Sequence, residues 1–141
     1  MTGIALAASL AAAVQMAPLT LEQQSIDRVK PRLEAAVRLI DAAGRADQAG
    51  FAALVLDGAT IFSEAESRLA PLTMAALAPL AGRCKPAPSF RLGFDDEVTV
   101  HWTCPGEPVR KLQTVFKFRA GRVAWASTEP SITYVLPPPP R

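Results

Sequence analysis

The sequence predicts an α+β fold in which a long kinked helix and short helices pack on a curved, cone-shaped antiparallel sheet. Apolar residues recur at three- and four-residue steps in the first half, which indicates helices. After residue 89 they alternate with polar residues, which indicates strands. Helices followed by a strand meander are typical of α+β domains. With 141 residues, 50% of them hydrophobic, the chain can bury one core.

The first helix is expected to begin at Thr20, because Thr20 and Gln23 have the spacing of a capping box. Its apolar face should consist of five residues at helical spacing: Ile26, Val29, Leu33, Val37 and Ile40. Pro31 lies inside this stripe and removes one backbone hydrogen bond. The stripe keeps its phase across the proline, which predicts one kinked helix that ends at Gly44.

Shorter elements should follow. Asp47 can cap a second helix that ends at Gly58, and residues 59–62 can form a brief strand. Ser63 and Glu66 again have capping-box spacing, which predicts a helix of about two turns ended by a proline at 71.

Thr73 can cap one more short helix over residues 74–81, which Gly82 would close. The two prolines that follow, Pro86 and Pro88, predict a loop.

The strands are read from alternation. Residues 90–94 alternate, and Val98, Val100, Trp102 and Cys104 share one face of the next strand. Residues 112–118 and 123–127 should form a hairpin. A two-residue loop at Ala120-Gly121 would pair Phe116 with Trp125, whereas a type I turn with Gly121 in a bulge shifts the register by one. The second is favoured, because the first places Ala120 at positive φ.

The ends of the chain predict three regions: a signal peptide or disordered Ala-rich leader at 1–19, one domain at 20–135 and a proline-rich tail at 136–141. Residues 4–14 form an uncharged apolar run with the length of a secretory core segment. This run is shorter than the roughly 20 residues of a membrane span. Export to the periplasm or the exterior is the expectation, and a frayed Ala-rich helix is the alternative.

Two cysteines, Cys84 and Cys104, are predicted to form a disulfide if the protein is exported. Two buried thiols in a cytosolic protein are the alternative. His101 is the only histidine, and neither cysteine belongs to a CxxC pair, so no metal site and no cofactor are predicted. A net charge of +2 without a basic cluster predicts no nucleic-acid partner.

Two stretches carry a resemblance to a known superfamily. The stretch LIDAAGRADQAGFAALVLDGATIF at residues 39–62 resembles a helix, glycine turn, acidic cap, second helix and first strand. The stretch FKFRAGRVAWAS at 116–127 resembles a hairpin with an aromatic-x-x-Gly-basic-Val pattern. Together they resemble the nuclear-transport-factor-2-like superfamily over roughly residues 20–130.

The resemblance implies a pocket between the helices and the concave face of the sheet. Trp102, Phe116, Trp125 and His101 are its candidate lining residues. His101 alternates away from Val100 and Trp102, which favours an exposed side chain. Trp102 and one of the other two aromatic residues should be buried against the first helix.

No catalytic residues are predicted, since the carboxylate and tyrosine set of the steroid-isomerase-like members does not map onto this chain. The expected function is an exported, non-catalytic domain that binds a small apolar ligand or a protein partner, with a possible homodimer through the sheet. The alternative is an isomerase- or lyase-like enzyme that uses the pocket.

Overall fold

Helix α2 (Leu21–Gly44) begins where Thr20 Oγ1 accepts a hydrogen bond of 3.0 Å from the Gln23 amide. The computed structural model describes residues 20–131, 139 and 140, so the expected leader and most of the expected tail lie outside the described residues. The Gln23 side chain donates to Asp27, and only half of the predicted capping box forms. The helix continues through Pro31, as its uninterrupted apolar phase predicts.

The buried face of α2 differs from the predicted stripe. Val29 and Ile40 are buried, but Val37 is 49% exposed and Leu39 is fully buried in its place. Four alanines complete the buried face: Ala35, Ala36, Ala42 and Ala43. Since alanine has a small side chain, these positions suit the close packing of α2 against neighbouring elements, of which helix α4 (Met74–Arg83) is the main one, and the larger Val37 lies on the solvent side.

Asp47 caps helix α3 (Gln48–Leu54) by accepting a hydrogen bond of 3.0 Å from the Gly50 amide, as predicted. The helix ends before Gly58, and strand β1 (Val55–Ser63) begins earlier than expected. Gly58 lies inside this strand at φ +79°, where the register with β6 shifts. A glycine tolerates this left-handed conformation at a bulge.

The helix predicted after Ser63 is wrong. Ser63 pairs with Arg68 at the end of a hairpin, and strand β2 (Arg68–Pro71) follows. A capping pattern is a local signal, and the pairing with β1 overrides it. Helix α4 (Met74–Arg83) forms as expected but continues past Gly82, and Thr73 makes no side-chain capping bond.

Strand β3 (Lys85–Ser89) replaces the loop expected at the prolines. It is the edge strand beside β4, where Pro86 and Pro88 can lie because an edge position does not require every N–H group. The strand expected at 90–94 is absent, and these residues form a loop in which Leu92 and Phe94 are exposed.

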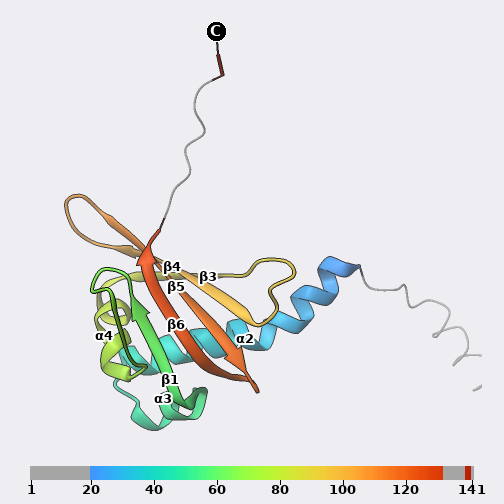
Figure 1. Cartoon of the computed structure of the whole chain (residues 1–141), viewed down its shortest axis with the longest axis horizontal. Coiled ribbons are helices and arrows are strands. Elements are labelled where there is room, and N and C mark those ends of the chain that lie inside the picture. Colours follow the sequence, from blue (N-terminus) through green and yellow to red (C-terminus); the bar gives the residue numbers. More distant parts are fainter. Residues whose placement is uncertain (1–19, 132–138, 141) are drawn as a thin grey trace, which may run out of the picture.

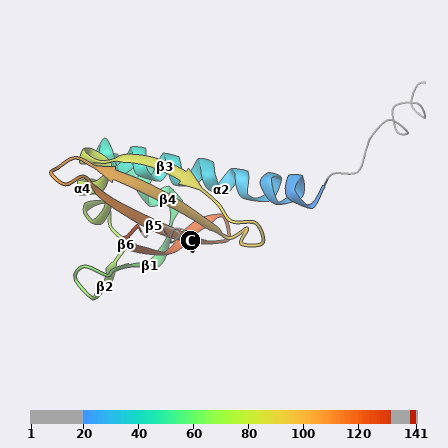
Figure 2. The same ribbon diagram turned by 90° about the horizontal axis from the view of Figure 1, so that it is seen from above.

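The meander is confirmed in strands β4 (Glu97–Cys104), β5 (Arg110–Arg119) and β6 (Arg122–Pro130). The six strands form one curved sheet in the order β2-β1-β6-β5-β4-β3, and helix α2 crosses one face (Figures 1 and 2). All neighbouring pairs are antiparallel except β1 and β6, which are parallel. The α+β architecture is therefore the predicted one.

The hairpin between β5 and β6 has a two-residue turn, and the predicted type I turn is wrong. Ala120 and Gly121 both have positive φ, 53° and 77°. The expected one-residue shift nevertheless occurs, at an irregularity between Lys117 and Phe118 of β5. Phe116 is thus opposite Ala126 and Trp125 is opposite Lys117, which places the two aromatic residues on opposite faces of the sheet.

Asp95 ties the start of α2 to the loop before β4. Ser25 Oγ donates to Asp95 Oδ1 at 2.7 Å, and Arg28 Nε donates to Asp95 Oδ2 at 2.6 Å. The hydrogen bond from Ser25, and after it that from Arg28, lowers the pKa of the Asp95 carboxyl below its ordinary value. The charged form is therefore favoured in the folded state.

This contact makes the stability depend on pH. A carboxyl whose pKa is lowered by folding stabilises the fold above its unfolded pKa of about 3.9, and this contribution disappears as the pH falls through the folded pKa. We expect Asp95→Asn to be less stable than the wild type at neutral pH and to lose less stability on acidification below about pH 4. Chemical unfolding over a pH series measures both. Asp96→Asn, at an exposed neighbour, is the matched control, and equally steep acid losses in Asp95→Asn and the wild type would contradict the expectation.

Candidate functional site

A cavity of about 530 Å³ lies between α4, the β1–β2 hairpin and the ends of β5 and β6. Its inner surface is mostly apolar, with Ile61, Ala70, Leu80 and Leu112 among its lining residues. Ile61 is buried, and the other three are half-buried. The sheet builds this surface because residues of one face alternate along each strand.

A row of polar side chains crosses four strands at the cavity. Ser63 of β1 is the register partner of both Arg68 of β2 and Thr128 of β6, and Thr128 is the partner of Thr114 of β5. Directly paired residues of neighbouring strands lie on the same face. Arg68, Ser63 and Thr128 line the cavity, whereas Thr114 is fully buried behind it.

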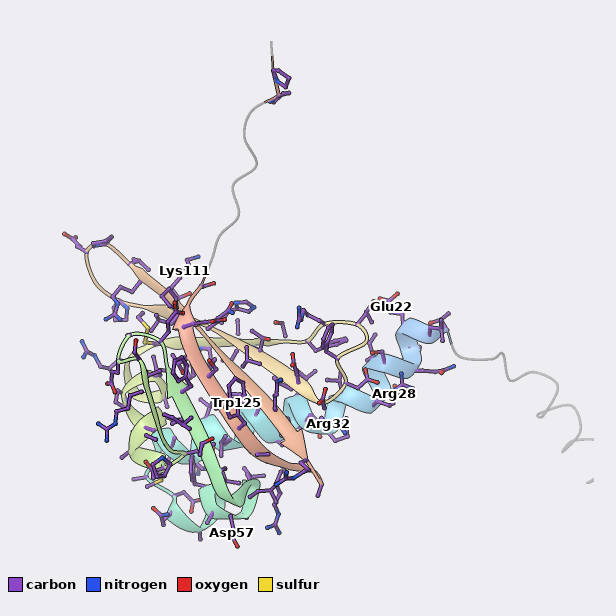
Figure 3. The ribbon with its side chains drawn as sticks, in the orientation of Figure 1. Glu22, Arg28, Arg32, Asp57, Lys111 and Trp125 are labelled. Carbon is purple, nitrogen blue, oxygen red and sulfur yellow. A yellow bond between two sulfur atoms is a disulfide. The ribbon has the colours of Figure 1, made fainter. Side chains whose placement is uncertain are left out.

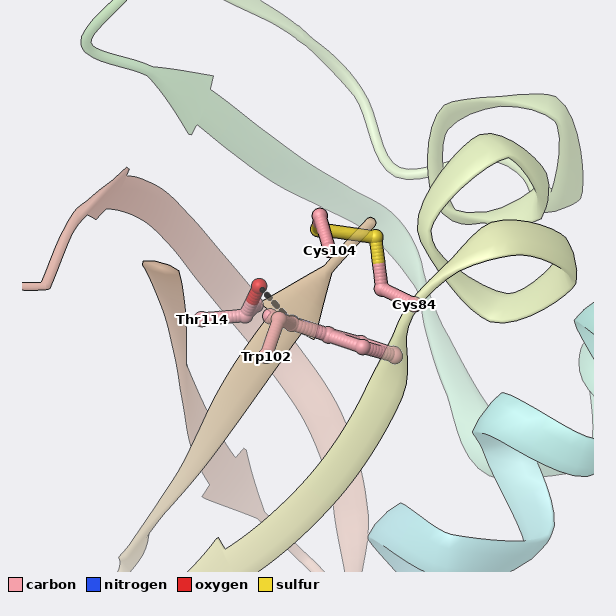
Figure 4. The surroundings of a disulfide bond; sticks show 4 residues. All are labelled: Cys84, Trp102, Cys104 and Thr114. Atoms are coloured by element: carbon pink, nitrogen blue, oxygen red, sulfur yellow. Dashed lines mark hydrogen bonds between the residues drawn. A yellow bond between two sulfur atoms is a disulfide. The ribbon is translucent and has the colours of Figure 1, made fainter. Parts of the chain in front are cut away.

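The buried end of this row is anchored by a tryptophan. Trp102 Nε1 donates a hydrogen bond of 2.9 Å to Thr114 Oγ1 (Figure 4). Thr114 Oγ1 is in turn 2.9 Å from Thr128 Oγ1. A chain of hydrogen bonds therefore connects the indole in the core to the wall of the cavity.

The rim of the cavity is charged. Arg68, Arg110 and Lys111 are exposed cationic residues that line it, and Figure 3 shows Lys111 at the end of the sheet opposite Asp57. None of the three forms an ion pair within residues 20–131. Glu66 and Glu129 are the acidic residues of the lining, but the Glu129 side chain accepts a hydrogen bond of 2.6 Å from Gln113, the register partner of His101, and so lies on the outer face.

The four residues predicted from sequence are divided between the two faces. Trp102 and Phe116 are 1% and 0% exposed on the inner face, where they belong to the core. His101 is exposed on the outer face, as its alternation predicts. Trp125 is half-buried on that face, with Lys117 Nζ 5.4 Å from its ring centre. None of the four lines the large cavity, and their contact with a ligand stays a prediction.

Sequence reasoning missed the residues that do line the cavity. Arg68 fell in a segment read as a helix, and Arg110 and Lys111 preceded the expected start of β5 at Leu112. One signal was present in the alternation. Thr114 is a polar residue on the face of the strand that also carries Phe116 and Phe118, and the rest of this face is apolar.

The predicted disulfide between Cys84 and Cys104 is present (Figure 4). It joins the end of α4 to the end of β4, next to a smaller hollow of about 220 Å³. This hollow shares Pro79, Leu80, Arg110 and Leu112 with the large cavity. The disulfide therefore holds α4, one wall of the cavity, against the sheet.

Among the described residues, no group of three His, Cys, Asp or Glu residues could hold a metal ion. No helix within the same residues has the length and apolar character needed to cross a membrane.

Solved structures similar to this chain share its architecture. Bal32a, from a soil-derived mobile gene cassette, is 18% identical, with a TM-score of 0.54 over 72% of this chain and 90% of its own. An NTF2-like protein of unknown function from Burkholderia xenovorans LB400 is 14% identical, with a TM-score of 0.51 over 79% and 88%. An LEH-like epoxide hydrolase from M. tuberculosis is 14% identical, with a TM-score of 0.52 over 71% and 82%.

At the level of sequence, no protein-family model and no curated protein matches the chain. The structural likeness covers most of the domain, and it agrees with the resemblance that residues 39–62 and 116–127 carry. The chain has the fold of the nuclear-transport-factor-2-like proteins.

Proposed function

We propose that this protein is an exported, non-catalytic domain that binds a small apolar ligand in the cavity between α4 and the sheet. The observation that carries the proposal is the apolar inner surface of a cavity of about 530 Å³. Small-molecule sites are concave, mostly apolar and commonly between 300 and 1,000 Å³, with a few polar groups that fix orientation. This cavity has that composition, and the core behind it is filled by Trp102 and Phe116.

An enzyme of the isomerase, lyase or hydrolase kind is the second candidate. The observation that favours it is the carboxylate of Glu66, which is part of the cavity lining. One fold neighbour is described as an LEH-like epoxide hydrolase. Loss of a turnover activity in Glu66→Gln, with binding retained, would favour the enzyme.

Export is part of the proposal. It is supported by the uncharged apolar run at residues 4–14 and by the disulfide, since such bonds persist in oxidising compartments. The intact mass of the protein from its native host should show the loss of about 13 to 20 N-terminal residues, in the usual range of a signal peptide. The full-length chain in the cytosol would contradict export.

Occupation of the cavity can be tested with a neutral apolar probe. N-phenylnaphthylamine should fluoresce on binding to the wild-type protein. In Ala70→Trp a large ring fills the half-buried wall of the cavity, so binding should fall about tenfold or more, the effect of losing about 1.4 kcal/mol of binding free energy.

Ala49→Trp is the matched control, because Ala49 is exposed on α3 and does not line the cavity. Unfolding curves should show that both variants fold. An unchanged affinity in Ala70→Trp, or no binding of the probe by the folded wild type, would contradict the proposed site.

A homodimer through the outer face of the sheet is the accompanying proposal for a partner. Trp125 and Phe62 are half-buried on this face, which gives it apolar area. Sedimentation of the purified protein over a concentration series tests it.

A further inference from the structure

The hydrogen bonds behind the cavity have a direction. The indole N–H of Trp102 can only donate, so Thr114 Oγ1 is the acceptor of their bond. Thr114 is fully buried, and its own hydroxyl proton requires an acceptor. Within the described residues, the hydroxyl oxygen of Thr128 at 2.9 Å is the one side-chain partner left for it. The chain therefore runs from Trp102 to Thr114 to Thr128.

This direction leaves a donor at the cavity. Thr128 Oγ1 accepts from Thr114, so the Thr128 hydroxyl proton is free to donate elsewhere. Thr128 lines the cavity, and among residues 20–131 its hydroxyl forms no second hydrogen bond. A buried donor is stabilised when it finds an acceptor, and a ligand oxygen in the cavity would supply one.

The charges around the cavity favour the same kind of group. Arg68 and Arg110 line the cavity with one acidic residue, Glu66, whereas strand register places the side chains of Lys111 and Glu129 on the outer face. Arg68 lies in the same register row as Ser63 and Thr128, and all three residues line the cavity, so one row of the inner face supplies an arginine and two hydroxyl residues to the lining. Arginine presents a planar fork of donors that matches a carboxylate.

We infer that the cavity holds an apolar monocarboxylate, with its hydrocarbon part against Ile61, Leu80 and Leu112 and its carboxylate between Thr128 and Arg68. This inference rests on the proposed function, because it names the chemical class of the ligand for the same cavity. The apolar wall accounts for the hydrocarbon part. The Thr128 hydroxyl and the Arg68 guanidinium, which forms no ion pair within residues 20–131, account for the carboxylate.

The test compares three molecules with the same hydrocarbon chain. Decanoate, decanol and methyl decanoate are titrated into the full-length protein at neutral pH and low salt, by calorimetry and by displacement of N-phenylnaphthylamine. We expect decanoate to bind about tenfold or more tightly than decanol or the ester, since hydrogen bonds to a charged group are the stronger ones.

Two variants assign this preference to residues. Arg68→Gln and Thr128→Val should each reduce the ratio of decanoate to decanol affinity by about fivefold or more, because each removes one partner of the carboxylate. Arg122→Gln and Thr103→Val are the matched controls. Both residues are exposed and neither lines the cavity, so the ratio should not change in them. Unfolding midpoints show whether each variant is folded.

The outcomes separate this inference from the proposed function. Equal affinity for decanoate and the ester, with the neutral probe still bound, would overturn the carboxylate and leave the apolar site standing. A preference for decanoate that survives both Arg68→Gln and Thr128→Val would overturn the placement of the carboxylate. Absence of binding of the probe and of all three compounds would overturn both. Tight decanoate binding that both variants weaken, with the neutral probe also bound by the wild type, would support the inference.

Discussion

Replacing Trp102 with alanine is expected to destabilise the fold by about 3–5 kcal/mol, the usual cost of truncating a buried tryptophan. The side chain is 1% exposed, and it is the largest of the fully buried ones. Its removal leaves a void in the part of the core that lies against strands β4 and β5. Since the net stability of a domain is about 5–15 kcal/mol, this variant should unfold at a much lower denaturant concentration.

The loss has a packing part and a hydrogen-bonding part, and two further variants separate them. Trp102→Phe keeps an aromatic ring but leaves Thr114 Oγ1 without its donor, and Thr114→Val leaves the indole N–H without its acceptor. Each should cost about 1–3 kcal/mol, because a buried polar group loses its partner. The double variant should cost less than the sum of the two, because neither partner is then left alone.

If the two single variants and the double variant showed additive losses of stability, the hydrogen bond between Trp102 and Thr114 would contribute nothing. The chain of hydrogen bonds that continues to Thr128 would then have no basis. A loss below about 1 kcal/mol for Trp102→Ala would mean that the indole does not fill the core, against the cost expected for a buried tryptophan. His101→Ala, next to it on the exposed face, is the surface control and should leave stability unchanged.

The parts of the fold that the sequence predicted are those with a strong local period. Helix α2 shows a helical repeat on both sides of Pro31, and β4 alternates from Val98 to Cys104 without interruption. The stripe on α2 was nevertheless misplaced at Val37, because four buried alanines carry no hydrophobic signal as clear as that of valine or leucine. Small residues become a buried face only when another element packs closely on them.

Both missed strands, β2 and β3, are edges of the sheet and depend on a partner. Lys85–Ser89 contains two prolines, a composition that locally indicates a loop, and only pairing with β4 makes it a strand. Residues 90–94 show the reverse error, since they alternate correctly but have no strand beside them. Alternation predicts the capacity to form a strand, and the topology decides whether the strand forms.

Local sequence patterns could not predict the candidate site for the same reason, because the site depends on which strands pair. The cavity depends on the parallel pairing of β1 with β6, which brings Ser63 next to Thr128 from distant parts of the chain. It also depends on the irregularity near Phe118, which turns Trp125 outward. Thr114 was visible as a polar residue on an apolar face, but its partners Trp102 and Thr128 became apparent only once the strands were in register.

Reduction of the Cys84–Cys104 disulfide is expected to destabilise the protein by about 3 kcal/mol on the chain-entropy model, because the bond closes a loop between cysteines 20 positions apart. The loss should be greatest around α4 and β3. Strand β3 lies at the edge of the sheet and pairs with β4 alone, so strand hydrogen bonds hold it on one side only. Hydrogen exchange of the reduced protein should therefore rise first in α4 and β3.

A Cys84→Ala/Cys104→Ala double variant provides the matched control. It should be about as unstable as the reduced wild type, and a reductant should leave it unchanged, whereas the oxidised wild type should lose its advantage when reductant is added. Because α4 forms one wall of the large cavity, both reduced and double-variant proteins should also bind the neutral apolar probe more weakly. Identical unfolding midpoints with and without reductant would show that packing alone holds α4 on the sheet. A lower unfolding midpoint with unchanged probe binding would show that the disulfide stabilises the fold but is not needed for the site, since the wall of the cavity would then keep its shape without the bond.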